Sequence, residues 1–159
     1  MIDFNNLSET SYKFQLERAP NVEYRVQQAQ IPGVSLGSVE IPTPFTKIPL
    51  PGNISYDDFT ITFMVAEHML DYLEILNWMV SIGQDRHLGQ MPKKFADTMS
   101  DATLTVLDSQ SKPIYNVNFV EMFPVSLSPL NFNVSITGPQ YVEVTASFKY
   151  TRFSVNKVT

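Results

Sequence analysis

The 159-residue sequence contains no cysteine, which excludes a disulfide framework and a thiolate metal site. Histidine occurs only twice, as His68 and His87, and neither has a second ligand at metal-binding spacing. We therefore expect no metal and no cofactor, and we interpret both histidines as solvated surface residues.

Charged residues are scarce, at 17% of the chain against about 25% in an average soluble domain. This shortage suggests that a partner covers part of the surface, although Ser, Thr, Asn and Gln could solvate it instead. The net charge of −5 gives no positive field for gripping nucleic acid. A mildly acidic surface is nevertheless compatible with a conduit through which DNA slides without sticking.

Long apolar runs are also missing. The segment Met69–Ile82 is the longest apolar-leaning one, but it is too short for a membrane span and carries Asp71 and Glu74. Residues Met1–Glu9 are polar and lack the basic start and apolar stretch of a signal peptide. We expect the protein to start in a cytoplasm and to enter no bilayer.

Catalytic motifs are absent as well. No serine lies in a nucleophile-elbow pattern, and Gly33 and Gly37 lack the remaining parts of a dinucleotide fingerprint. The Asp57 and Asp58 pair could bind a cation, but a turn before a strand explains it more simply. We expect no catalytic, cofactor-binding or metal site, and hence no enzyme.

What the sequence does contain is alternation of apolar and polar residues, which indicates antiparallel strands. The clearest strand runs through Phe59, Ile61, Phe63 and Val65, and we expect it to be central. Further strands are predicted in pairs, with 123–131 as a connector: 12–17 with 22–27, 103–107 with 114–121, and 132–137 with one long closing strand at 141–153.

One segment changes period. Leu70, Leu73, Leu76 or Asn77, and Val80 recur at helical spacing, which predicts a helix at about residues 67–82 that ends at Gly83. Residues 84–100 read as a loop. The predicted fold is therefore mainly β, a sandwich or barrel of antiparallel strands with one flanking α-helix, in a single domain spanning 1–159.

Residues 31–53 are interrupted by prolines and glycines. Proline removes a ladder donor, so this segment should be an extended arm or long loop with at most a short edge strand. Its apolar content favours docking onto protein over disorder.

The stretch Ile31–Met79 carries the motifs PTPF, IPLPG, FTITF and NWM in that order. It resembles the N-terminal signature of the tail tube protein family of contractile-tailed bacteriophages. The C-terminal VEVTASFKYTRFSV resembles the closing strand of that family. The likeness covers most of the chain and is weakest over Gln84–Ser100.

This resemblance implies a tail-tube-like β-sandwich and a structural virion protein that forms hexameric, stacked rings. Two hairpins of each subunit would join an inner barrel, whose Thr, Ser, Gln and Asn side chains line a conduit for DNA ejection. The implied partners are other copies of the chain and the sheath, tape-measure and baseplate proteins of a virion tail assembled in the host cytoplasm. Four arm residues are then candidate inter-subunit contacts: Ile41, Phe45, Ile48 and Leu50.

Two alternatives stay open. The same fold serves baseplate tube-initiator and head–tail adaptor proteins, which bind other tail proteins and do not polymerise alone. A carbohydrate-binding β-sandwich would instead need Tyr12, Tyr24 and Tyr141 exposed on one concave patch.

Overall fold

The structure of the protein is a computed structural model that describes residues 11–23, 25–83, 98–134, 138 and 140–158. The described residues are mainly strand, which confirms the predicted fold class. The elements are β1 (Tyr12–Leu16), α1 (Pro20–Glu23), β2 (Val26–Gln30), β3 (Val34–Pro42), β4 (Lys47–Tyr56), β5 (Phe59–Met64), α2 (Leu70–Gly83), β6 (Ser100–Leu107), β7 (Pro113–Leu127), β8 (Glu143–Lys149) and β9 (Arg152–Lys157).

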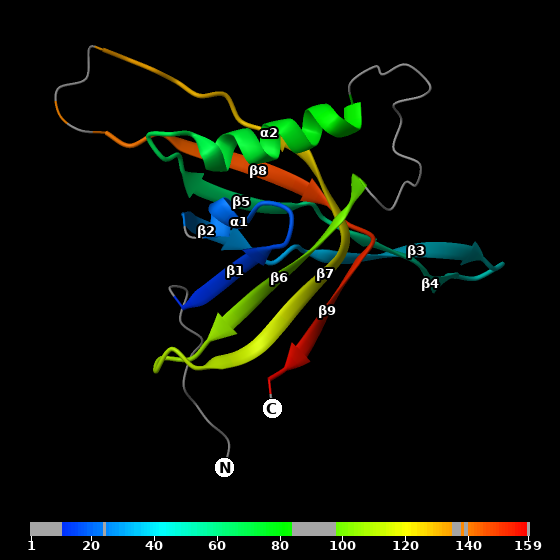
Figure 1. Cartoon of the computed structure of the whole chain (residues 1–159). Helices are drawn as coiled ribbons and strands as arrows, with labels where there is room; N and C mark the ends of the chain where they lie inside the picture. The colour runs from blue at the N-terminus through cyan, green and yellow to red at the C-terminus, as the bar shows by residue number, and fades with distance from the viewer. Residues whose placement is uncertain (1–10, 24, 84–97, 135–137, 139, 159) are drawn as a thin grey trace.

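The strands of the body form two layers that share one long strand (Figure 1). The order of the continuous sheet is β1-β6-β7-β8-β5-β2, and β9 pairs with β7 as well. The first half of β7 pairs with β6 and β9, whereas its end, Phe123–Leu127, pairs with β8. We call β2, β5, β8 and the end of β7 the upper layer, and β1, β6, β9 and the first half of β7 the lower layer.

The core lies between these layers. Every second residue of β5 points inward, so Phe59, Ile61 and Phe63 are fully buried. The ring of Phe59 packs 4.5 Å from Phe119 of the lower layer and 5.5 Å from Phe14 of β1, measured between ring centroids. Full burial of such side chains stabilises the fold by about 1.5–3 kcal/mol each. As predicted, β5 has neighbours on both sides, β8 and β2.

The helix α2 closes one side of this core. It starts three residues later than predicted, and its buried residues are Asp71, Ile75 and Trp78. The Trp78 ring packs 6.2 Å from that of Phe148, and its indole nitrogen donates to the Thr98 carbonyl at 2.8 Å.

The buried carboxylate of Asp71 holds the start of α2. It accepts hydrogen bonds from the backbone N–H of Ala66 at 3.0 Å and of Tyr72 at 2.9 Å. The Nε of Arg25 lies 3.9 Å away and offsets its charge. A helix start leaves backbone donors without intrahelical partners, and Asp is among the residues best suited to satisfy them.

The predicted N-terminal hairpin is wrong. Strand β1 pairs with β6, far along the chain, and β2 pairs with β5. The helix α1 occupies the expected turn, and the second strand starts at Val26 rather than at Val22. The reason is that Val22 is drawn into the core, with no exposed surface, on the helical turn.

The C-terminal half also differs from the prediction. The hairpin of β6 and β7 is confirmed, but β7 continues to Leu127 through the expected connector. The expected closing strand is divided between Lys149 and Arg152 into β8 and β9, because its two halves pair with different parts of β7. Residues 132–134 are not a strand, and 135–137 lie outside the described residues.

Candidate assembly surfaces

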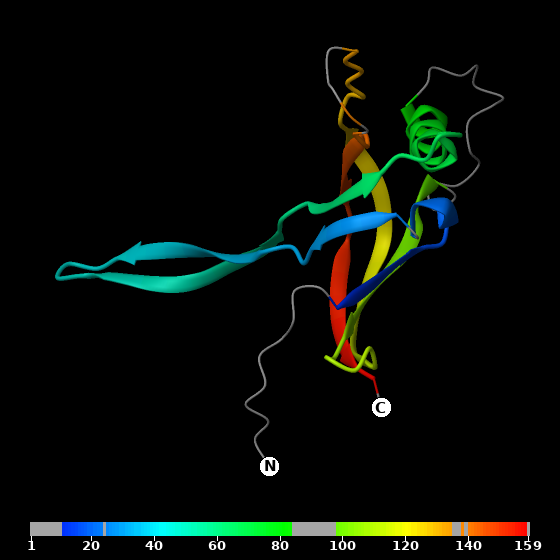
Figure 2. The same ribbon diagram turned by 90° about the vertical axis from the view of Figure 1, so that its left-hand side faces the viewer.

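The most prominent surface feature is a two-stranded ribbon, residues 34–56, which we call the arm. Figure 2 shows it projecting far from the body, on the side opposite α2. The expectation of at most a short edge strand is wrong, because β3 and β4 have nine and ten residues. Pro49 and Pro51 fit because each strand of a two-stranded ribbon has one free edge, where a missing N–H costs no ladder bond.

The tip of the arm is closed by a turn between Thr43 and Thr46. The backbone N–H of Thr43 donates to the Thr46 carbonyl at 2.9 Å, and the Thr46 N–H donates to the Thr43 hydroxyl at 3.2 Å. This turn presents Phe45 with 98% of its surface exposed. Burial of an aromatic side chain is favourable, so covering the Phe45 ring with another surface would lower its free energy.

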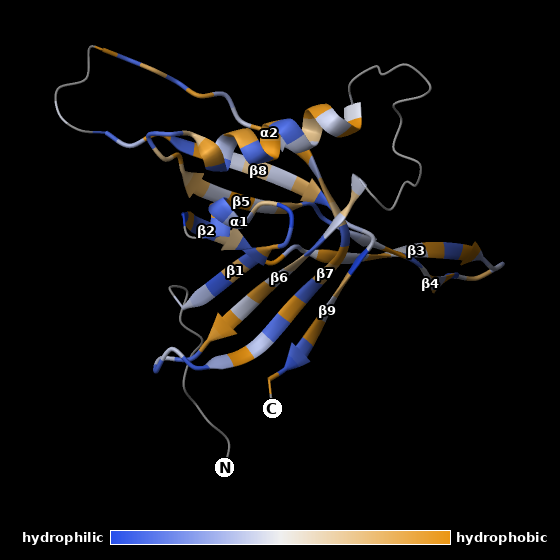
Figure 3. Ribbon diagram, viewed as in Figure 1, coloured by the Kyte–Doolittle hydropathy of each residue, from blue (hydrophilic) through white to orange (hydrophobic). Residues whose placement is uncertain are grey.

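All four predicted contact residues lie in the outer half of the arm and are exposed. Figure 3 shows hydrophobic stretches along both strands of the arm. Ile41 lies directly opposite Ile48 across the ladder, and Leu50 lies opposite Val39. Residues directly opposite share one face of a ribbon. The two pairs form one apolar group, which we call the tip cluster: Val39, Ile41, Ile48 and Leu50.

Sequence reasoning missed a second apolar group nearer the body, which is exposed except for the partly buried Tyr56. Val34 lies opposite Tyr56, and Leu36 lies opposite Ile54. We call these four residues the base cluster. The alternation of Val34 with Leu36 is visible in the sequence, but Gly37 and Ser38 break it before Val39, so the segment did not read as a strand.

A β-bulge separates the two clusters. The ladder pairs Leu36 with Ile54 and Ser38 with Pro51, so β4 uses one residue more than β3 at this point. Gly37 and Gly52 meet here: a Cβ on Gly52 would lie 3.0 Å from the Gly37 carbonyl oxygen. Such a contact is tighter than most Cβ contacts in proteins, so a side chain at position 52 would require the facing backbone to shift, and this favours glycine at the bulge.

Aromatic side chains anchor the arm to the body. The Tyr56 ring lies 6.0 Å from that of Tyr150 and 5.6 Å from that of Phe153, between centroids. The Tyr150 hydroxyl donates to the Asp57 carbonyl at 2.8 Å. Partial burial, together with the nearby carboxylates of Asp57 and Asp58, raises the pKa of Tyr150 to about 12. The Tyr150 hydroxyl therefore stays protonated, and can donate this hydrogen bond, at pH values well above the ordinary pKa of tyrosine.

The upper layer ends in two open edges. The strand β2 pairs only with β5, and the end of β7 pairs only with β8, so in the described residues no strand pairs with the other edge of either. These edges lie at opposite ends of the layer. Open edges are templates for pairing with another chain.

The outer face of the upper layer is polar and largely uncharged. Thr60 faces Ser147 with their hydroxyl oxygens 3.4 Å apart, and the Thr62 and Thr145 hydroxyls lie 3.2 Å apart. Gln28 and Gln30 of β2 are exposed beside them. Along β8 the charged residues of this face, Glu143 and Lys149, stand at the two ends.

A family model for phage tail tube proteins matches residues 1–156. The chain belongs to the phage tail tube protein family. This match confirms the family that the Ile31–Met79 motifs predicted. No curated protein matches the chain.

Several solved structures share the fold of this tail tube family member over nearly its whole length. It is similar to the tube-terminating cap of the anti-feeding prophage, with a TM-score of 0.74, 11% identity, and 99% of this chain and 95% of that chain covered. A chain of the PVC sheath–tube complex in its extended state gives 0.71, 13% identity, and coverage of 98% and 94%. A chain of the anti-feeding prophage baseplate gives 0.66, 11%, 98% and 97%. At these identities the likeness shows the fold.

The tail tube family member also exposes an apolar stripe on α2. Leu70, Leu73 and Val80, whose spacing signalled the helix, are each more than one-third exposed. The periodicity therefore marks the solvent side, while Ile75 and Trp78 form the buried side.

The part of the chain that the structure describes contains no arrangement of side chains that resembles a catalytic or metal-binding site. Its residues contain no cluster of His, Asp and Glu that could hold a metal ion, and no helix that could span a membrane. His68 is exposed, and His87 lies outside the described residues. Asp101 and Glu121 come close, but their carboxylates accept from the Glu121 N–H and the Thr151 hydroxyl, which gives them a structural role.

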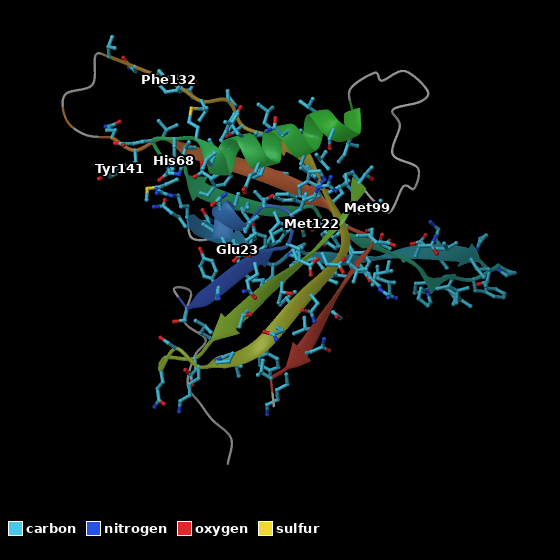
Figure 4. The ribbon with its side chains drawn as sticks, in the orientation of Figure 1. Glu23, His68, Met99, Met122, Phe132 and Tyr141 are labelled. Atoms are coloured by element: carbon cyan, nitrogen blue, oxygen red, sulfur yellow. The ribbon has the colours of Figure 1, made fainter. Side chains whose placement is uncertain are left out.

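A hollow of about 510 Å³ lies beside Phe132 and Tyr141, at the end of the molecule away from the arm (Figure 4). Tyr141 and Glu143 are the ionisable groups that line it. Tyr12 instead packs partly against the core, and Tyr24 lies outside the described residues. The tyrosine patch of a sugar-binding site is therefore not formed by Tyr12 and Tyr141, and the family indicates a structural protein.

Proposed function

We propose that the chain is the ring-forming subunit of a phage tail tube, in which six copies close a conduit for DNA ejection. The observation that carries this proposal is the upper layer, a sheet with two open edges and one uncharged polar face. Its partners would be further copies of itself and the sheath, tape-measure and baseplate proteins of the virion tail.

The open edges support ring closure. Because β2 and the end of β7 are different strands at opposite ends of one layer, pairing between copies is head-to-tail. Head-to-tail contacts form rings when the rotation between copies closes, and closure would remove both free edges of the upper layer. Continuous pairing of upper layers would thus produce a barrel. The number six follows from the resemblance to the family.

The polar face supports the conduit. The inner face of the upper layer is filled by Phe59, Ile61 and Phe63 and covered by the lower layer and α2, so the hydroxyl-lined face is the one free to form a wall. Hydroxyl and amide groups hydrate well but do not attract phosphates as Lys or Arg would. DNA could therefore move along this wall without being held.

A second candidate function is a baseplate tube-initiator or head–tail adaptor of the same fold. It is favoured by the fold likeness to a baseplate chain of the anti-feeding prophage. Such a protein would bind a platform of other tail proteins and would not polymerise alone. The exposed stripe Leu70, Leu73 and Val80 on α2 and the arm would then contact those proteins.

Negative-stain electron microscopy of the purified protein, followed over time and at increasing concentration, tests the proposal. Six-fold rings or stacked tubes would support the tube subunit. A persistent monomer at every concentration would contradict autonomous ring formation and favour the adaptor or initiator. A monomer that forms rings only when a purified baseplate is added would favour the initiator specifically.

A further inference from the structure

We propose that the arm engages two different neighbouring copies of the chain, one through the base cluster and the other through the tip cluster, which lie on opposite faces of its ribbon. This inference rests on the proposed ring-forming function. It assigns separate assembly steps to two groups of residues only a few positions apart.

The opposite placement follows from the ladder register. Side chains alternate between faces along a strand, and β3 gains no extra residue between Val34 and Ile41. Val34 and Leu36 therefore lie on one face, whereas Val39 and Ile41, after a step of three residues, lie on the other. The facing residues of β4 follow, because paired residues share a face.

The polar residues show the same switch in reverse. Near the body, the face opposite the base cluster carries Ser35 and Ser55, whose hydroxyl oxygens lie 2.9 Å apart. Near the tip, the face opposite the tip cluster carries Glu40 and Lys47, joined by an ion pair of 2.9 Å. Each half of the arm therefore has one apolar and one polar face.

The bulge makes this switch possible in both strands at once. The apolar residues of β4, at positions 48, 50, 54 and 56, keep an even spacing, whereas those of β3 change parity between Leu36 and Val39. In a regular ladder the two patterns would fall out of step, and apolar residues would face polar ones. The extra residue of β4 near Gly52 restores four matched apolar pairs.

Copies of the chain are the occupants because the arm continues the edge at which a ring would close. The strand β2 ends at Gln30 and β3 begins at Val34, so a copy paired with the open edge of β2 would lie alongside the arm's base. The base cluster includes Tyr56, whose ring packs on Tyr150 of the body. The tip, ending at Phe45, extends beyond the body and can reach a copy in the next ring (Figure 2).

Two matched double variants separate these contacts. Leu36→Thr with Ile54→Thr removes one apolar pair of the base cluster, and Ile41→Thr with Ile48→Thr removes one pair of the tip cluster. Threonine keeps a high strand propensity, so the ribbon should persist. Ser35→Thr with Ser55→Thr is the control on the polar face. All four residues to be replaced are about half exposed or more, so circular dichroism and thermal melting should match the wild type.

The expected result, scored by electron microscopy and sedimentation, is that the tip variant forms single rings but raises the concentration needed for tubes by at least about tenfold, since two half-buried aliphatic contacts are lost per copy. The base variant should fail to form rings at all, and the control should assemble as the wild type does. Identical defects in the base and tip variants would overturn the inference, as would normal tubes from either. A wild type that never assembles would instead defeat the proposed function.

Discussion

The anchor between the arm and the body gives the most specific prediction, because one hydroxyl can be removed without disturbing its ring. Tyr150→Phe keeps the contacts of the ring with Tyr56, Phe119 and Phe153 but deletes the 2.8 Å hydrogen bond to the Asp57 carbonyl. Loss of such a bond should lower the free energy of unfolding by about 0.5–1.5 kcal/mol. For a domain of this size the melting temperature should fall by about 1–6 °C.

The same change should alter the response to alkaline pH. The folded-state pKa of Tyr150 is about 12, against 10.0 for an ordinary tyrosine. The folded state therefore holds this proton more tightly, and stability falls as the pH rises from 10 towards 12. The stabilisation is fully present below pH 10 and is lost as the pH passes the folded pKa.

Chemical denaturation of the wild type and of Tyr150→Phe across this pH range measures the effect, at protein concentrations below the onset of assembly. The difference in free energy of unfolding between the two proteins should be constant below pH 10 and should shrink above it. Tyr141→Phe, at an exposed tyrosine, is the control and should show neither effect. A difference that stays constant up to pH 12, or grows, would refute the role assigned to the Tyr150 hydroxyl.

Three further substitutions test the core, the arm and the helix start. Phe59→Ala should cost about 3–5 kcal/mol in urea denaturation, because it leaves a cavity among buried rings; a cost below about 1 kcal/mol would contradict the core described. Gly52→Ala should leave the melting temperature unchanged but reduce tube formation seen by microscopy, because its Cβ lies 3.0 Å from the Gly37 carbonyl oxygen and forces the bulge to shift, whereas Gly83→Ala meets open space and should assemble normally. Asp71→Ala should lower the free energy of unfolding by about 1–3 kcal/mol, because buried N–H groups lose their acceptor; unchanged thermal unfolding would show that the helix start needs no such support.

Local patterns in the sequence predicted the strands and turns whose structure depends on neighbouring residues. The strand at Phe59–Met64 follows from strict alternation, and the turn between β6 and β7 follows from nearby polar residues and Pro113. The motifs around the arm led to the correct family. These features depend on residues close together in the chain.

Pairings between distant residues were not predictable in the same way. Strand β1 was expected to pair with its sequence neighbour, but it pairs with β6 because Val22 is buried on a helical turn between them. The prolines of β4 suggested a loop, since a single sequence does not reveal which edge of a strand is free. The face of α2 was not given by periodicity either, because both Leu70 and Ile75 belong to apolar stripes and only packing selects one.

The sequence predicted the exposed apolar residues near the tip of the arm but not those near its base. Ile41, Phe45, Ile48 and Leu50 all lie on the exposed arm, and their role between subunits stays a prediction. The base cluster was missed because its paired residues across the ladder are about 20 residues apart in sequence, and because a bulge changes the apolar pattern of the arm between this cluster and the tip cluster. A glycine pair between two short alternating segments is the signal that could have indicated it.

The central claim is that copies close through the open edges of the upper layer and form a wall from its hydroxyl-lined face. A cryo-EM reconstruction of the assembled wild-type protein tests this most directly. We predict a closed ring in which β2 of one copy pairs with the end of β7 of the next, with Thr60, Thr62, Thr145 and Ser147 facing the lumen. A ring whose lumen is lined by the lower layer or by α2, or an assembly in which these edges stay unpaired, would contradict it.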